Sequence, residues 1–209
     1  MSAPLSADDA LYRVVEISGQ AEIFDGAGGN WRPLEENARI LAGSKLRTGR
    51  ESGADLVRDA YFENALRIGP SSVVTFLSAN PVRVSLDEGS VYILKEEHHE
   101  LRILTKDFLV SAREGGFKLD FTKPASTMLK VFADSVQIFK KTPEGYSHVA
   151  ETVEEGFRFT PSGRARMNYE DYLDWQAWCR KNDERKDQAW KEAPVGYRGH
   201  LKRLRVREW

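Results

Sequence analysis

The sequence predicts a mainly β fold, a sandwich-like or flattened solenoid stack of short strands with a C-terminal capping α-helix. From Tyr12 to about Phe159, apolar and polar residues alternate with the period of two that a half-buried strand requires. Turn-forming Gly, Asn and Pro residues recur between the apolar runs, for example at 25–30. Beyond this body the alternation ends and a helical pattern follows. We therefore expect an all-β domain over residues 12–160, and a helix with a basic tail packing on it over residues 165–209.

The β domain is expected to contain about ten or more short strands, joined by turns every ~8–12 residues. The first strand begins at Tyr12. Further short apolar runs lie at 56–58, 65–68, 82–86, 91–94, 101–104 and 128–132. Gly49 and Gly89 fall at turns between such runs, where a positive φ suits glycine.

The helix is expected over residues 168–192. Asn168 is a residue type favoured at a helix N-cap, and Asp171 places a carboxylate in the first turn. A narrow apolar stripe follows, made of Tyr172, Trp175, Cys179 and Trp190. Trp178 lies outside this stripe, and the charged stretch 180–187 is typical of a solvated extension. We expect the stripe to pack over an open end of the β body and to protect its edges.

Composition excludes several classes of function. Thirty-one Lys and Arg residues against 32 Asp and Glu give a net charge of −1, so no overall field favours nucleic acid. The single cysteine, Cys179, excludes an intramolecular disulfide framework. No apolar run approaches the ~18–20 residues of a membrane helix, so this chain is not expected to insert into a membrane. The N-terminus resembles no secretory signal, which fits either a cytosolic protein or a mature exported segment.

One cluster has metal-ligating residue types, the Glu-Glu-His-His-Glu stretch at 96–100. A zinc or copper site needs three or more ligands that converge from one side. On a strand His98 and His99 would point to opposite faces, and in a turn all five side chains would spread into solvent. We interpret the stretch as a polar hairpin tip. Since no nucleophile motif or phosphate-binding loop occurs either, the sequence indicates no metal, no cofactor and no enzymatic activity.

Three consecutive pieces of the β region are more specific: Leu-Arg-Thr-Gly at 46–49, Ser-Gly-Ala-Asp-Leu at 52–56, and Leu-Arg-Ile-Gly-Pro-Ser-Ser at 66–72. Together they resemble the core signature of the FecR domain, and further pieces follow in the expected order to 153–156. The sequence departs from the family pattern at 59–64, where the family favours Asp-Gly-Ser. Because the signature consists of turn residues and core positions, it specifies a fold and not a catalytic site.

The resemblance implies a non-enzymatic protein of the bacterial envelope, periplasmic or on the cell surface, whose signal or anchor precedes this sequence. It implies action by contact with a protein partner, in transmembrane signalling or regulation. The alternative is a module that binds cell-wall or surface polysaccharide.

The aromatic and basic residues of the last 35 positions supply a candidate interaction surface. Trp and Tyr are enriched at binding sites, and a basic tail can contact an acidic partner or a polyanionic polymer. The alternative is that these residues have no binding role: the helix then only packs on the core, and the basic tail is only solvated. The candidate residues are Trp178, Trp190, Arg203, Arg205, Arg207 and Trp209.

Overall fold

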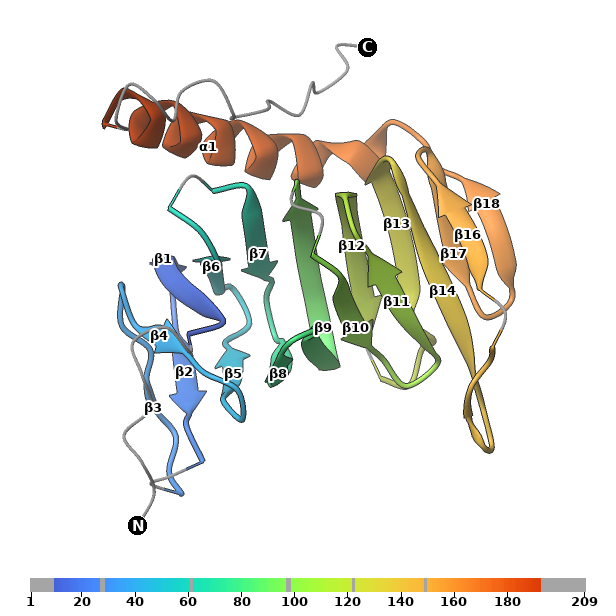
Figure 1. Ribbon diagram of the computed structural model, residues 1–209, viewed down its shortest axis with the longest axis horizontal. Helices are drawn as coiled ribbons and strands as arrows, with labels where there is room; N and C mark the ends of the chain where they lie inside the picture. The colour runs from blue at the N-terminus through green and yellow to red at the C-terminus, as the bar shows by residue number, and fades with distance from the viewer. Residues whose placement is uncertain are drawn as a thin grey trace.

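The computed structural model describes residues 10–26, 29–60, 62–96, 99–121, 123–148 and 150–192. It confirms the predicted fold class, since short strands form two packed layers and one helix, α1 (Glu170–Glu192), lies against them (Figure 1). The strands do not close into a barrel. The strand pattern ends at Arg166, six residues beyond the expected position, because β17 is followed by a hairpin partner, β18.

Within the described residues each layer has nine strands, counting the shared strand β9 (Val82–Lys95) in both. Layer A runs in the order β4 (Arg39–Ile40), β1 (Tyr12–Ser18), β6 (Gly53–Val57), β7 (Asn64–Ile68), β9, β12 (Gly115–Phe121), β13 (Met128–Ala133), β17 (Phe157–Thr160) and β18 (Gly163–Arg166). Layer B runs in the order β3 (Arg32–Pro33), β2 (Ala21–Phe24), β5 (Lys45–Thr48), β8 (Val73–Ala79), β9, β10 (Leu101–Leu104), β11 (Phe108–Ala112), β14 (Ser135–Thr142) and β16 (Glu151–Glu154). The short β15 (Gly145–Tyr146) pairs with β14.

Strand β9 joins the two layers. Residues 82–88 pair with β8 and, in parallel, with β10, whereas residues 89–95 pair with β7 and β12. The change of layer occurs at Gly89, whose φ of +88° suits glycine, as the sequence predicts. A Cβ there would lie 2.2 Å from the Ser72 hydroxyl oxygen, so side-chain space is missing as well.

The core lies between the layers and follows the predicted alternation. Leu56, Leu66, Ile93, Phe117 and Phe159 point inward, and each is 1% exposed or less. Residues on the other face of layer A are also buried where the helix covers them, which explains why 91–94 is a continuous apolar run and not an alternating one.

The residues that resemble the FecR signature form buried turn contacts. Thr48 Oγ1 donates to the Gly69 carbonyl at 2.6 Å and accepts from the Ser72 N–H at 3.0 Å. Ser72 Oγ accepts from the Ser90 N–H, and Ser52 Oγ accepts from the Gln20 N–H. Gly49 does not adopt the predicted positive φ. Glycine fits there because a Cβ would lie 3.0 Å from Ser52 Oγ.

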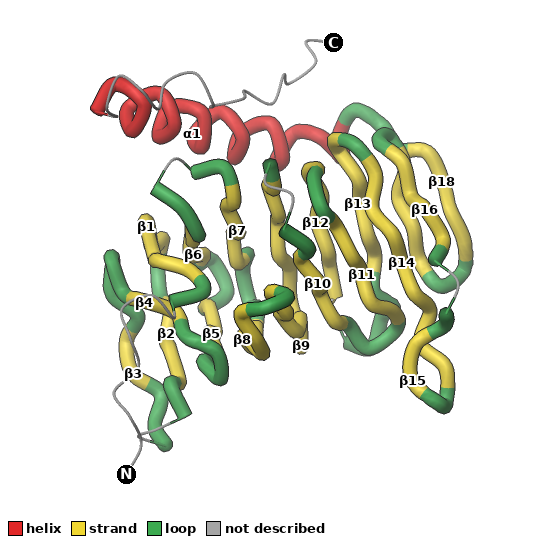
Figure 2. The backbone as a smooth tube through the Cα atoms, in the orientation of Figure 1, coloured by secondary structure: helices red, strands yellow, loops and turns green. Residues whose placement is uncertain are grey.

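Helix α1 crosses the strands along the length of layer A (Figure 2). Its aromatic side covers outward-facing residues of several strands, among them Tyr92, Leu94 and Phe132. The predicted capping helix is therefore present, and it packs on outward-facing side chains of layer A. The N-cap is as predicted, since Asn168 and Asp171 exchange reciprocal hydrogen bonds of 3.1 and 3.0 Å between side chain and backbone N–H.

Candidate interaction surfaces

The largest hollow that we describe lies where the β17–β18 hairpin meets the start of α1, and we call it the hairpin groove. It has a volume of about 430 Å³, within the usual range of ligand pockets. It is lined by Glu155, Gly156, Phe157, Arg166, Met167, Asn168, Tyr169 and Tyr172. The lining therefore comes from the turn before β17, the end of β18 and the first turn of the helix.

Apolar surface is exposed beside this groove. Tyr169 is 63% exposed and Leu173 is 46% exposed, whereas Tyr172 is buried against Phe132. Tyr172 in the first turn of α1 thus faces the sheet, whereas Tyr169, the residue before the helix, faces solvent.

Two guanidinium groups lie over the half-buried ring of Phe157. The Arg164 group lies 4.6 Å and the Arg166 group 5.7 Å from the ring centroid. Arg164 also forms an exposed ion pair with Glu154 at 3.4 Å. The outer strand of the hairpin therefore places positive charge next to the groove.

Asp171 anchors the helix start to the sheet. Its carboxylate lies 2.8 Å from Lys130 Nζ and 3.9 Å from the Arg158 guanidinium. Burial by itself would raise the pKa of Asp171, but the hydrogen bonds from Lys130 and the Asn168 N–H outweigh it and hold the pKa below its ordinary value. The groove therefore has one wall that is fixed electrostatically.

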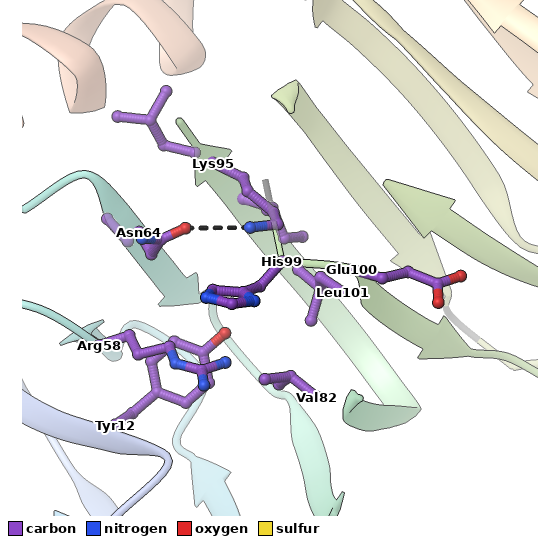
Figure 3. A pocket seen from close by; sticks show the side chains of 11 residues that line it. Tyr12, Arg58, Asn64, Val82, Lys95, His99, Glu100 and Leu101 are labelled. Carbon is purple, nitrogen blue, oxygen red and sulfur yellow. Dashed lines mark hydrogen bonds between the residues drawn. The ribbon is translucent and has the colours of Figure 1, made fainter. Parts of the chain in front are cut away.

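A second hollow, between β7, β9 and the start of β10, is too small for a substrate (Figure 3). Its volume is about 10 Å³, which is room for a single water molecule. Lys95 Nζ donates to Asn64 Oδ1 at 3.2 Å beside it, and burial raises the pKa of Tyr12 to about 12. We interpret these polar residues as parts of the core.

The described members of the 96–100 stretch do not converge. Glu96 pairs with Lys186 on the helix, whereas Glu100 accepts two hydrogen bonds from Arg102, at 2.8 and 2.9 Å. His98 lies outside the described residues. Within the described ranges, no group of three or more His, Cys, Asp or Glu side chains could hold a metal ion.

The structure places only part of the predicted interaction surface. Trp178 is 2% exposed and packs on Tyr92 and Trp175, at centroid distances of 5.8 and 5.4 Å. It therefore belongs to the packed side of the helix, contrary to the expectation that it lies outside the stripe, and its ring is not available to a partner or a glycan. Trp190 is half-buried.

The remaining candidates, Arg203, Arg205, Arg207 and Trp209, lie outside the described residues. Cys179 is buried. Burial is the main cause that raises the pKa of its thiol to about 12, and the nearby Asp183 carboxylate adds to it. A thiol with such a pKa is unreactive.

The sequence predicts that the charged stretch 180–187 of α1 is a solvated extension. In the structure, several of its side chains contact the sheet instead. Lys181 and Arg185 pair with Glu16 on β1, and Arg185 also donates to Asp55 on β6 at 2.9 Å. Lys186 pairs with Glu96, and both side chains are less than 10% exposed. These basic side chains face acidic residues of layer A. The helical periodicity of the sequence does not show this, because it carries no information about which strands lie opposite the helix.

No family model matches the chain, and no curated protein sequence matches it. Two crystal structures from Parabacteroides distasonis ATCC 8503, each described as a "putative anti-sigma factor", are similar to it. The structure at 1.65 Å resolution has 8% identity and a TM-score of 0.50, over 63% of this chain and 64% of its own. The one at 2.50 Å resolution has 10% identity and a TM-score of 0.48, over 63% of each chain.

The similarity thus covers less than two thirds of those proteins, and at such low identity it concerns the fold alone. The resemblance to the FecR family stays a prediction. Among the described residues, no helix is both long enough and apolar enough to cross a membrane.

Proposed function

We propose that this chain is a non-enzymatic regulatory protein of the bacterial envelope that acts by binding another protein. The observation that carries the proposal is the hairpin groove, an apolar hollow with Tyr169 and Leu173 exposed beside it. Exposed aromatic residues next to a hollow are typical of protein-binding surfaces. By contrast, polar side chains such as Asp171, Arg185 and Thr48 form ion pairs or turn hydrogen bonds within the protein.

Two further points support a role in signalling. The signature at 46–72 resembles the FecR domain of envelope regulators, and the fold is similar to that of a protein described as a "putative anti-sigma factor". A periplasmic or cell-surface location follows from the resemblance. The polysaccharide-binding alternative gains no support, because Trp175 and Trp178 are buried against the sheet.

A photo-crosslinking experiment in the native host tests the proposal. A photoreactive amino acid replaces Tyr169 in one variant and the exposed Glu36, at the other end of the stack, in a control variant. We expect a discrete crosslinked protein in the envelope fraction from the Tyr169 variant only. Recovery of the chain in the cytosolic fraction, or equal crosslinking from both positions, would contradict the proposal.

A further inference from the structure

Strand β18 ends layer A and, among the described residues, pairs with β17 alone (Figure 1). All four of its residues are exposed. The edges at the other end of the stack, β3 and β4, are two residues long, and β3 contains Pro33. Two-residue strands and proline hinder further pairing. β18 has four residues and no proline, and its edge is protected only by the positive charges of Arg164 and Arg166, which disfavour a like-charged strand. Among the residues that the structure describes, layer A therefore has a four-residue edge open to further pairing, next to the hairpin groove.

The hydrogen-bonding pattern of the hairpin shows which groups of β18 are free. Met167 N–H donates to the Gly156 carbonyl at 2.9 Å, and bonded pairs alternate along an antiparallel ladder. The pair Arg158 and Ala165 is then bonded, and the backbone N–H and C=O groups of Arg164 and Arg166 face outward. Within the part of the chain that the structure describes, no strand lies on that side of β18.

Charge decides which strand fits this edge. Arg164 pairs across the ladder with Phe159, and Arg166 pairs with Phe157, so the two arginines lie on one face. Arg166 lies over the Phe157 ring and makes no ion pair with any described residue. A second copy of β18 would bring these arginines opposite one another, and like charges directly opposite are destabilising. Acidic side chains at alternate positions would be favoured.

We propose that β18 and the hairpin groove bind an extended acidic segment of a partner protein, which adds to layer A as an additional strand. This proposal says where the partner protein binds and which side chains recognise it, and it rests on the proposed function of binding another protein. The partner's main chain bonds the outward groups of Arg164 and Arg166. Two acidic side chains meet the arginines, and one apolar side chain enters the groove beyond Arg166.

The geometry also gives the order of the recognised residues. The groove lies at the C-terminal end of β18. In an antiparallel partner strand, the apolar residue therefore precedes the acidic ones, in the pattern apolar-x-acidic-x-acidic. A parallel partner strand would show the reverse order.

A displayed library of random eight-residue peptides, selected on the full chain, tests the proposal. Selected peptides are then synthesised with a fluorescent label, and their affinities are measured by anisotropy. We expect the pattern above to be enriched. We also expect Arg166→Glu to weaken these peptides about tenfold and to favour copies with Lys in place of the acidic residues.

A matched pair of variants isolates the main-chain contact. Arg164→Ala removes the side chain beyond Cβ and keeps the backbone N–H, whereas Arg164→Pro also removes this N–H, which β17 does not use. We expect the proline variant to bind about fivefold more weakly than the alanine variant, at equal melting temperature. If the proline variant melts lower, Tyr169→Ala and Arg166→Glu still test the groove and the charge.

Three outcomes would overturn the proposal: no enrichment above the empty support, selected peptides that bind the Arg164→Pro and Arg164→Ala variants equally well, or a dimer in light scattering that Arg164→Pro abolishes. The second outcome would place binding elsewhere and leave the proposed function standing. Failure of the Tyr169 crosslinking in cells, with these peptides still bound, would count against the function instead.

Discussion

The two halves of α1 attach to the same sheet by different physical means. The first half packs aromatic rings, with Trp175 stacked on Phe132 at a centroid distance of 4.6 Å and an interplanar angle of 8°. The second half contributes Arg185 and Lys186, which pair with acidic residues of layer A and the residue after β9. One half is rich in aromatic residues and the other is highly charged, yet both are docked. A mixed-charge helical segment can therefore be an interface whenever the facing sheet carries the complementary charges.

The largest expected effect comes from the aromatic half. Trp175→Ala should cost about 3–5 kcal/mol of unfolding free energy, since a buried indole leaves a large cavity. Trp178→Ala should cost a similar amount, because this ring is equally buried. Chemical denaturation of both variants measures the costs. A mild effect of Trp178→Ala beside a severe effect of Trp175→Ala would show that only the original stripe carries the packing.

The charged half gives the second effect. Arg185→Ala should cost about 2–3 kcal/mol, because Asp55 would keep a buried carboxylate, 6% exposed, without its closest cation. Lys181→Ala is the matched control, since Lys181 is 43% exposed and also pairs with Glu16. It should cost less than about 1 kcal/mol. Equal and small effects of both variants would mean that the second half of the helix is held by its aromatic first half alone.

The pH dependence separates the ends of the helix. The folded-state pKa of Asp171 is below its unfolded value of 3.8, so the stability that it contributes is present above about pH 4 and is lost as the pH falls through the lower folded value. Glu96 has the opposite sign: burial raises its pKa although Lys186 opposes this, so lowering the pH relieves a cost.

Denaturation curves between pH 7 and pH 3 should therefore show a smaller acid loss for Asp171→Asn than for the parent protein. Glu96→Gln should show a larger one. Parallel curves for all three proteins would contradict both assignments.

The smallest expected effect is at the N-cap. Asn168→Ala should cost about 1 kcal/mol, because the Asp171 N–H loses its side-chain acceptor. Asn168→Asp keeps an acceptor and is the control. A melting temperature of Asn168→Ala equal to that of the parent would indicate that tertiary packing alone sets where the helix begins.

The sequence by itself determined the local features. The period of two predicts the strands, Asn168 and Asp171 predict the helix start, and Gly89 predicts a positive φ. These features depend on near neighbours in the chain, so they can be read from short segments. The hydrogen bond from the Ser72 N–H to Thr48 Oγ1 is not such a local feature, because it joins residues 24 positions apart.

Only the tertiary structure decided how distant segments meet. It placed Trp178 against Tyr92, brought Arg185 to Glu16 and Asp55, and set β18 at an open edge beside Tyr169. Each of these contacts joins residues that are either far apart in sequence or related by sheet order, and helical periodicity cannot show which charges face the helix. The uncovered edge is the clearest case, because whether a strand gains a second neighbour depends on the order of the whole sheet and not on its own four residues.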